Sequence, residues 1–285
     1  MTACAAAPGL APPRPATPAP QPVARAPHAP PSLDPACNAE RWRAAAEVNA
    51  RSLQALAWAP FGRVETGWEI YVPLIQHEIR TGCPPGSEGF AAALADWQSR
   101  NGQTADGVFT EAAFLTVKGV VQSRRDFVRF TSVGPCPETP DLVVAARPEE
   151  GLGGKSVWLR PRALEAYRAM VAAARAEVPE IAANPDSLAI FSGYRSPAAD
   201  AARCRAEGNC DGIVRARCSP HRTGLAVDLY VGHAEGYMAD STADPNRLHM
   251  TRTAAYRWLT ANAARFGFVN YAFEPWHWEW TGEPP

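Results

Sequence analysis

The chain has 285 residues, 46% of them hydrophobic, and a net charge of -1 at pH 7. This length and composition allow a globular protein with one large domain or two ordinary ones. The near-zero charge leaves no basic stripe to neutralise a phosphate backbone, so we expect no nucleic-acid partner. The sequence contains no apolar run of about eighteen residues, so we expect no transmembrane span.

Residues 1–35 contain 11 of the 28 prolines and few apolar side chains larger than alanine. Such a segment cannot bury enough surface to offset its chain entropy, so we expect a disordered Pro/Ala-rich tether. Its first residues lack the charged and apolar regions of a signal peptide. Thr2-Ala3-Cys4 resembles the end of a bacterial lipoprotein signal, which makes Cys4 a candidate lipid anchor; the alternative is a free thiol.

The chain contains seven cysteines, which is many for a cytosolic enzyme of this size. This number is typical of an oxidising compartment, so we expect an exported protein of the periplasm or cell envelope. Six cysteines besides Cys4 leave room for up to three disulfides. Because the spacings of Cys204, Cys210 and Cys218 are unlike those of zinc-finger ligands, we expect disulfides there too.

Residues 36–130 are expected to form a small all-helical domain. Its helical periodicity begins in the segment 37–58, where apolar side chains can share one face. Farther on, a helix should end near Asn101-Gly102 and a second one should begin after Thr110, which is a good N-cap. We expect a tight turn between them.

This helical hairpin resembles a type of peptidoglycan-binding domain, in which a helix with a Trp-Gln or Phe-Gln pair runs into a Gly-x-x-x-Asp-Gly turn. The matching residues are Trp97, Gln98, Gly102, Asp106, Gly107, Val108 and Phe109, and Thr110 replaces the usual glycine. The resemblance implies that this domain binds peptidoglycan glycan. The alternative is a helical spacer with an ordinary Asp-Gly turn.

Residues 131–150 are interpreted as a linker and residues 151–285 as a second domain. Helices are expected at 161–178, from 197 and at 251–267, and strands at 187–195, 226–231, 268–273 and 276–280. The polar stretch 231–250 reads as a loop. This order predicts an α+β fold, a small antiparallel sheet with flanking helices that carries the metal site described next.

The strand pattern separates the residue types of the last predicted strand. Trp276, Trp278 and Trp280 should line one face and pack in the core, while His277 and Glu279 line the other. Pro275 removes a strand hydrogen-bond donor, so Glu274 should lie in the turn before the strand.

Asp228 lies on the predicted buried strand 226–231, where an unpaired charge would cost several kcal/mol. Together with His221 and His277 it offers two nitrogen ligands and one oxygen ligand. Such a set suits a zinc ion, Zn2+, with one open position, the catalytic type of zinc site. We expect Glu274 to act as the catalytic base toward a water activated there.

Two further charged residues are assigned supporting roles. Arg195, at the end of a predicted strand, can bind a substrate carboxylate in bidentate fashion or stabilise an oxyanion. Glu279 shares the face of His277, so it either orients that histidine or serves as a rival base; we favour orientation. His233 and His249 lie in the polar stretch and are expected to have no role in the site.

Three motifs of this half resemble the zinc D-alanyl-D-alanine carboxypeptidases and dipeptidases of the VanY type. They are Ser-Gly-Tyr-Arg-Ser, Ser-x-His-x-x-Gly-x-Ala-x-Asp and Glu-x-Trp-His, in the family's order between residues 192 and 277. The resemblance implies His221, Asp228 and His277 as zinc ligands, Glu274 as catalytic base, Arg195 as the residue that stabilises substrate or transition state, and Ser219 and Tyr194 as substrate-binding residues. The cysteine-containing segment 204–218 departs from the family.

The resemblance implies a peptidase that acts on the peptidoglycan stem peptide, removing the terminal D-alanine as a D,D-carboxypeptidase. L,D-carboxypeptidase and endopeptidase activities of the same fold are the nearest alternatives. An alternative of another class is a zinc-containing wall-binding module without catalysis. Glu274 argues against that module, because a pure binder has no need of a base.

Overall fold

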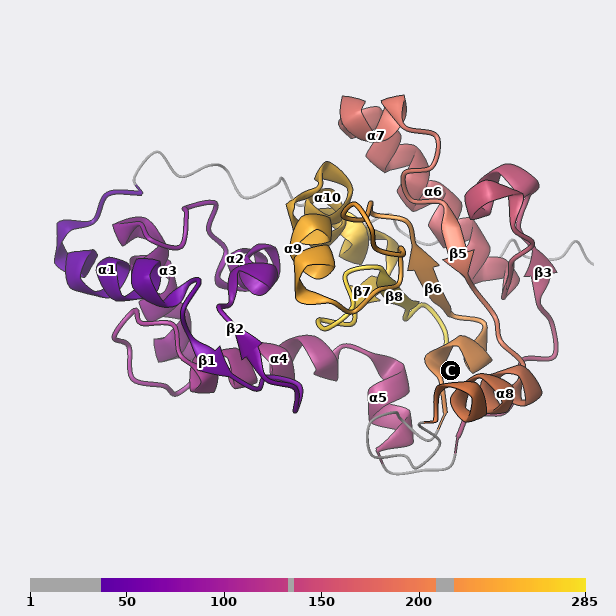
Figure 1. Cartoon of the computed structure of the whole chain (residues 1–285), viewed down its shortest axis with the longest axis horizontal. Coiled ribbons are helices and arrows are strands. Elements are labelled where there is room, and N and C mark those ends of the chain that lie inside the picture. Colours follow the sequence, from indigo (N-terminus) through magenta and orange to yellow (C-terminus); the bar gives the residue numbers. More distant parts are fainter. Residues whose placement is uncertain (1–36, 133–135, 209–217) are drawn as a thin grey trace, which may run out of the picture.

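The computed structural model describes residues 37–132, 136–208 and 218–285 (Figure 1). We call residues 37–132 the helical part, and residues 136–208 with 218–285 the sheet part. The predicted tether, the candidate anchor Cys4 and Cys210 lie outside the described residues. Every helix in the described residues is too short or too polar to span a bilayer.

The helical part confirms the predicted hairpin. Thr110 caps the second helix of that hairpin, since its hydroxyl accepts a hydrogen bond from the Ala113 N–H at 3.2 Å. Short 3-10 helices precede the first two α-helices, at Glu40–Trp42 and Glu69–Tyr71. The α-helices are α1 (Arg43–Ser52), α2 (Val72–Ile79), α3 (Glu88–Arg100), α4 (Glu111–Ser123) and α5 (Asp126–Thr131).

The prediction that this part is entirely helical is wrong. β1 (Ala57–Trp58) pairs antiparallel with β2 (Glu65–Thr66). The end of the segment 37–58 is therefore a strand, and the helix α1 within that segment ends at Ser52. Gly62 has a φ of 76° in the loop between the two strands, a conformation that glycine adopts readily. Trp58 then lies in the core, and its indole donates to the Gly67 carbonyl at 2.9 Å.

The residues of the peptidoglycan-binding-like motif hold the turn between α3 and α4 together. The Gln98 side chain accepts from the Gly107 N–H at 2.9 Å and donates to the Val108 carbonyl at 3.1 Å. A Cβ at Gly107 would lie 2.6 Å from the Ala91 carbonyl oxygen, so this close approach requires glycine. Gln98 and Gly107 therefore have a structural role here, and glycan binding stays a prediction.

The sheet part has the predicted α+β architecture. A four-stranded antiparallel sheet has the order β5-β6-β8-β7. A separate two-stranded pair joins β3 to β4. The strands are β3 (Val144–Ala145), β4 (Trp158–Leu159), β5 (Ile190–Ser192), β6 (Ala226–Leu229), β7 (Phe268–Asn270) and β8 (His277–Trp280).

Helices flank this sheet (Figure 1). They are α6 (Pro161–Glu177), α7 (Pro179–Ala183), α8 (Pro197–Glu207), α9 (Asp244–Arg252) and α10 (Ala254–Asn262), with 3-10 helices at Pro148–Glu150, Leu152–Gly154, Pro220–Thr223 and Ala263–Phe266. The prediction of a loop at 231–250 is wrong for its last seven residues, because α9 begins at Asp244. The predicted helix 251–267 is divided, since the Thr253 hydroxyl caps α10 by accepting from the Tyr256 N–H.

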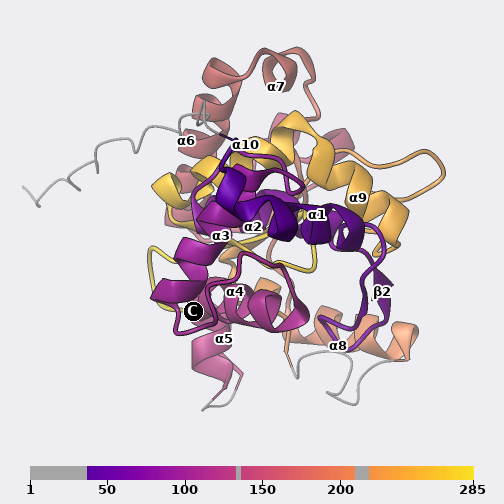
Figure 2. The ribbon, with the colours of Figure 1, turned by 90° about the vertical axis from the view of Figure 1, so that its left-hand side faces the viewer.

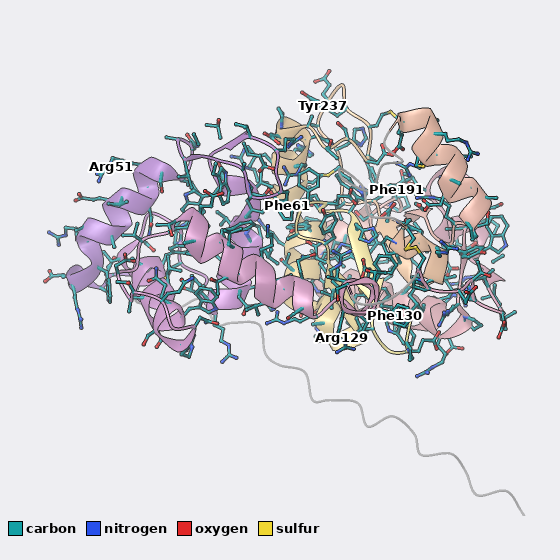
Figure 3. The ribbon with its side chains drawn as sticks, turned by 90° about the horizontal axis from the view of Figure 1, so that it is seen from below. Arg51, Phe61, Arg129, Phe130, Phe191 and Tyr237 are labelled. Carbon is teal, nitrogen blue, oxygen red and sulfur yellow. A yellow bond between two sulfur atoms is a disulfide. The ribbon has the colours of Figure 1, made fainter. Side chains whose placement is uncertain are left out.

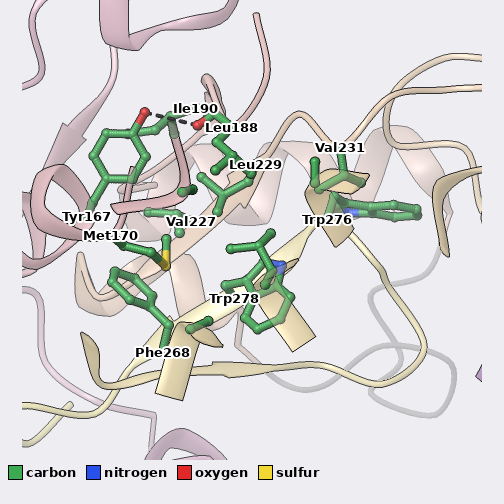
Figure 4. Packing of buried hydrophobic residues seen from close by; sticks show 14 of the residues in the cluster. Tyr167, Met170, Leu188, Ile190, Val227, Leu229, Val231, Phe268, Trp276 and Trp278 are labelled. Atoms are coloured by element: carbon green, nitrogen blue, oxygen red, sulfur yellow. Dashed lines mark hydrogen bonds between the residues drawn. The ribbon is translucent and has the colours of Figure 1, made fainter. Parts of the chain in front are cut away.

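The tryptophans of the last strand pack as its alternation predicts. Trp276 and Trp278 are buried in the core of the sheet part, together with Val227 and Leu229 of β6 (Figure 4). Trp280 is buried in the same core. α6 closes this core, and the Tyr167 hydroxyl donates to the Leu188 carbonyl at 2.9 Å. This packing fixes which face of β8 the neighbouring polar residues occupy.

The helical part and the sheet part are joined by a polar and aromatic interface. Arg247 of α9 is fully buried and donates to Glu65 at 3.0 Å, to the Tyr71 hydroxyl at 2.7 Å and to the Phe273 carbonyl at 2.9 Å. Phe61 lies where the two parts meet, 5.2 Å from the ring of Phe273 (Figure 3). Seen from the helical end, α1 to α3 lie in front of α9 and α10 (Figure 2). The helical part thus supports the loop between β7 and β8.

The structure contains disulfides, as the number of cysteines predicts. Cys37 pairs with Cys83 within the helical part, and Cys136 pairs with Cys218 in the sheet part. Cys204 is disulfide-bonded as well. The prediction of disulfide use is confirmed for Cys204 and Cys218, and the second of these bonds ties the chain next to Ser219.

Candidate metal centre

Two neighbouring strands place Asp228 and His277 together. In the pairing of β6 with β8, Asp228 lies directly opposite His277, while Val227 lies opposite Trp278. Residues that are opposite each other project to the same face of a sheet. Because the tryptophan packs in the core, the histidine and the aspartate share the other face.

His221 completes the cluster from the 3-10 helix that precedes β6. Ser219 caps this helix, because its hydroxyl accepts from the His221 N–H at 3.3 Å. Gly224 then ends the helix with a φ of 70° and leads the chain into the strand that carries Asp228. The chain therefore returns within seven residues from the histidine to the aspartate.

The ligating atoms of His221, Asp228 and His277 all lie within 4.8 Å of one another, and the three side chains are buried. The Asp228 Oδ1 lies 3.2 Å from the His221 Nε2 and 2.9 Å from the His277 Nδ1. Such a convergence of two imidazole nitrogens and one carboxylate is the donor set of a catalytic zinc site. The sequence predicts that these three residues lie together, and the structure brings them together.

The second nitrogen of each histidine has its own partner. The His221 Nδ1 lies 2.8 Å from the Gly193 carbonyl, and the His277 Nε2 lies 3.1 Å from the Glu279 Oε1. Such partners fix the ring orientation and leave the other nitrogen free to bind a metal. The residues present therefore fit a zinc ion on chemical grounds.

Gly193 of the Ser-Gly-Tyr-Arg-Ser motif makes this arrangement possible. A Cβ at this position would lie 2.5 Å from the Val157 Cγ1 and 2.6 Å from the Trp158 carbonyl oxygen. Only glycine allows the backbone to approach β4 so closely. The Gly193 carbonyl can then accept the hydrogen bond from His221. This explains why the motif has glycine at this position.

The charges of the cluster shift its titration. Burial would raise the pKa of Asp228, but His221 and His277 hold it well below its ordinary value. Burial would lower the pKa of His277, whereas hydrogen bonds from its ring to Asp228 and Glu279 raise it to about 9. A metal at this site would therefore replace a proton on His277.

Glu279 is engaged by a residue that sequence analysis missed. Arg125, between α4 and α5, donates to the Glu279 Oε1 from Nε at 3.0 Å and also from Nη2. Burial would raise the pKa of Glu279, but Arg125 and the hydrogen bond to His277 lower it to about 2. A carboxylate held in this way suits orientation of His277 better than proton transfer.

Glu274 lies in the turn before β8, as the position of Pro275 predicts. Its N–H donates to the Tyr271 carbonyl at 2.9 Å, and its carbonyl accepts from the His277 N–H at 3.0 Å. Its side chain is half-buried, and burial raises the pKa of its carboxyl above the ordinary value. These bonds fix Glu274 beside the strand that carries His277.

Arg195 lies beside the backbone of His221. Its backbone N–H donates to the His221 carbonyl at 3.1 Å. Its guanidinium donates to the Ser192 hydroxyl at 3.2 Å, and to the Asp200 Oδ1 and the Ser219 hydroxyl at 3.4 Å each. Burial lowers the pKa of Arg195 from its ordinary value, and Asp200 opposes that shift.

The remaining predicted residues have a less direct relation to the cluster. The Tyr194 N–H donates to the Trp158 carbonyl at 2.7 Å, and its side chain is half-buried. His233 contacts the Tyr230 hydroxyl at 3.0 Å, and His249 lies in α9. Neither of these two histidines belongs to the cluster.

The part of the chain that carries the cluster is similar to a known protein family. Residues 156–283 match the family model VanY, described as D-alanyl-D-alanine carboxypeptidase. A search of curated proteins found no match. The matched span contains the whole cluster as well as Arg195, Glu274 and Glu279, whereas Arg125 lies outside it. Residues 156–283, somewhat less than half of the chain, are therefore similar to the VanY domain of D-alanyl-D-alanine carboxypeptidases.

Proposed function

We propose that this chain is a zinc-dependent peptidase of peptidoglycan stem peptides, and that it removes the terminal D-alanine as a D,D-carboxypeptidase. The observation that carries the proposal is the convergence of His221, Asp228 and His277 within 4.8 Å. Their partners at Gly193 and Glu279 leave one nitrogen of each histidine for a metal. The family match supplies the substrate class.

In this proposal the three clustered residues hold the zinc ion. When bound, zinc supplies Lewis-acid chemistry, which activates water and polarises a carbonyl group. Buried ligands with fixed ring orientations keep the donor atoms in place before the substrate arrives. The hydrolysis of the peptide bond then depends on residues that move protons and hold the substrate.

Glu274 is the proposed general base. Its carboxylate takes the proton of the attacking water and passes it to the leaving amine of D-alanine. The raised pKa of its carboxyl favours both steps, because the carboxylate is a better proton acceptor and its acid form exists nearer to neutral pH. Glu279 is not suited to this task while Arg125 occupies its Oε1.

Arg195 is the proposed anchor for the free carboxylate of the substrate. Its contacts with Ser192, Asp200 and Ser219 span 3.2 to 3.4 Å, so they are long, and a planar guanidinium has further N–H donors. A substrate carboxylate can therefore accept a bidentate pair from it. Ser219 and Tyr194 complete this side of the proposed binding site. A requirement for a free terminal carboxylate favours an exopeptidase.

The cellular place of the protein belongs to the same proposal. The disulfides Cys37–Cys83 and Cys136–Cys218 suit an exported protein of the periplasm or cell envelope. A lipid anchor at Cys4 and glycan binding by the helical part stay predictions. Peptidoglycan lies in such a compartment, which is where the proposed substrate is available.

Mass spectrometry of the products from defined muropeptides tests the proposal. The zinc-loaded chain should shorten a pentapeptide stem by one D-alanine and leave tetrapeptide and cross-linked stems intact. Shortening of the tetrapeptide would indicate L,D-carboxypeptidase activity, and cleavage of the cross-link would indicate an endopeptidase. Binding of muropeptide without any cleavage would indicate a wall-binding module rather than an enzyme.

A further inference from the structure

The helical part contributes one buried charge to the neighbourhood of the candidate metal centre. Arg125 is 6% exposed, and its guanidinium lies 4.5 Å from the centroid of the Tyr271 ring. Its Nε donates to the Glu279 Oε1 at 3.0 Å, and its Nη2 donates to the same oxygen. A third group, Nη1, donates to the Gln122 side chain. The guanidinium is thus held from several sides.

The oxygen that Arg125 contacts is also the one that faces the proposed zinc ligand. The Glu279 Oε1 lies 3.1 Å from the His277 Nε2, while the His277 Nδ1 lies 2.9 Å from Asp228. Arg125, Glu279 and His277 therefore form a continuous hydrogen-bonded chain that ends in the cluster. The matched family span begins at residue 156, so the first member of this chain comes from outside it.

We infer that Arg125 is a positioning residue of the metal centre, so the helical part completes the zinc site of the sheet part. This inference rests on the proposed function. Among the described residues the second oxygen of Glu279, Oε2, has no hydrogen-bond partner. The position of the carboxylate therefore depends on the contacts of Oε1 alone, and Arg125 supplies two of them.

Removal of Arg125 would leave Glu279 as a buried charge with His277 as its remaining partner. A buried charge without compensation is unfavourable, so the carboxylate would turn away or admit water. The His277 ring would then lose the acceptor that aims its Nδ1 at the metal position. Loss of such an outer partner typically weakens metal affinity about 10- to 100-fold.

An ion pair elsewhere in the interface provides the matched control. Arg252 of α9 pairs with Glu69 of the helical part, and within the described residues it forms no hydrogen bond or ion pair with the cluster, Glu279 or Glu274. Arg252→Gln therefore loosens the same interface without touching the proposed chain. A purely structural role for Arg125 would give the two variants the same zinc affinity.

Zinc affinity of the full chain, measured by competition with a chromophoric chelator, tests the inference. Arg125→Met should weaken zinc binding about tenfold or more, and Arg252→Gln should leave it unchanged. Arg125→Met combined with Glu279→Gln should bind zinc no more weakly than Glu279→Gln alone, because both changes break one chain. The absorption spectrum of bound Co2+ should change in the same variants.

If Arg125→Met does not fold, Arg125→Lys decides the question, since it keeps the charge and loses the forked pair of donors to Glu279. Weaker zinc binding is again expected. Zinc affinity equal to that of the unmodified chain, or fully additive effects of the changes at Arg125 and Glu279, would overturn the inference. His221→Ala serves as the separate check of the site itself. If His221→Ala binds zinc as tightly as the unmodified chain, the proposed function fails rather than the role of Arg125.

Discussion

Asp228 and His277 lie directly opposite each other on neighbouring antiparallel strands, with the Oδ1 of the first 2.9 Å from the Nδ1 of the second. This register leaves little freedom at the site, because a slip by one residue would bring Trp278 to the metal face and His277 into the core. The buried tryptophans of β8 prevent such a slip. The packing of the core and the geometry of the candidate centre thus depend on the same strand pairing.

Glu274→Gln should retain zinc and lose hydrolysis. Glutamine keeps the shape and the backbone contacts of this turn residue but cannot accept a proton, so the rate should fall about 10²- to 10⁴-fold. Turnover of a pentapeptide stem and the zinc content of the same preparation check this together. Full activity of Glu274→Gln would mean that the base is assigned wrongly, and Glu279 would be the next candidate.

Glu279→Gln is the control for that experiment. It should mainly weaken zinc affinity, because it replaces the charged acceptor of the His277 Nε2 by a neutral one. Zinc at saturating concentration should restore most of its turnover. Turnover that stays abolished with the site fully loaded would contradict the division of roles between the two glutamates.

Arg195→Lys should reduce kcat/KM for the pentapeptide about 10- to 100-fold, the worth of one charged hydrogen bond. Lysine keeps the positive charge but cannot form the bidentate pair with a carboxylate. The unmodified chain should also discriminate against a stem whose last carboxylate is amidated, and Arg195→Lys should discriminate less. Equal rates on the free and amidated stems in the unmodified chain would refute a carboxylate anchor at Arg195.

The fold contains a pH-sensitive contact away from the site. Glu150 accepts from Arg168 at 2.7 and 2.9 Å and from the Arg147 N–H at 2.7 Å. Burial would raise the pKa of its carboxyl, but Arg168 and Arg147 lower it from 4.5 to about 2. The stabilisation is therefore complete above pH 4.5 and is lost as the pH falls toward 2.

Urea unfolding of the unmodified chain and of Glu150→Gln, measured between about pH 6 and pH 3, checks this contact. The free energy of unfolding of Glu150→Gln should be lower at pH 6, and the difference should shrink as the pH falls. A difference that stays constant over this range would show that the charge of Glu150 contributes nothing.

The sequence predicted those elements whose pattern is local. Strand alternation placed Trp276, Trp278 and Trp280 in the core, and Pro275 placed Glu274 in the turn, because both rules concern neighbouring residues. α9 escaped prediction because its hydrophobic side is short and a charged residue, Arg247, is buried against the helical part. β1 and β2 escaped because strands of two residues have no periodicity.

The same limit applies to the candidate site. Residues of the three motifs were predicted because their types and spacing match a family, and the structure brings His221, Asp228 and His277 together. Arg125 carries no such signal, since 154 residues separate it from Glu279. The sequence signal that could have indicated a partner such as Arg125 is Glu279 itself. Its carboxylate lies on a strand between two buried tryptophans, and a buried carboxylate needs a counter-charge.

Reactivation by zinc tests the central claim most directly. The chain would be freed of metal with a chelator, and hydrolysis of a pentapeptide stem would be followed as zinc is added back. We predict no hydrolysis without metal, full recovery at one equivalent of zinc, and no recovery at that ratio in Asp228→Asn. Hydrolysis that survives metal removal, or equal recovery of Asp228→Asn, would contradict a zinc centre at His221, Asp228 and His277.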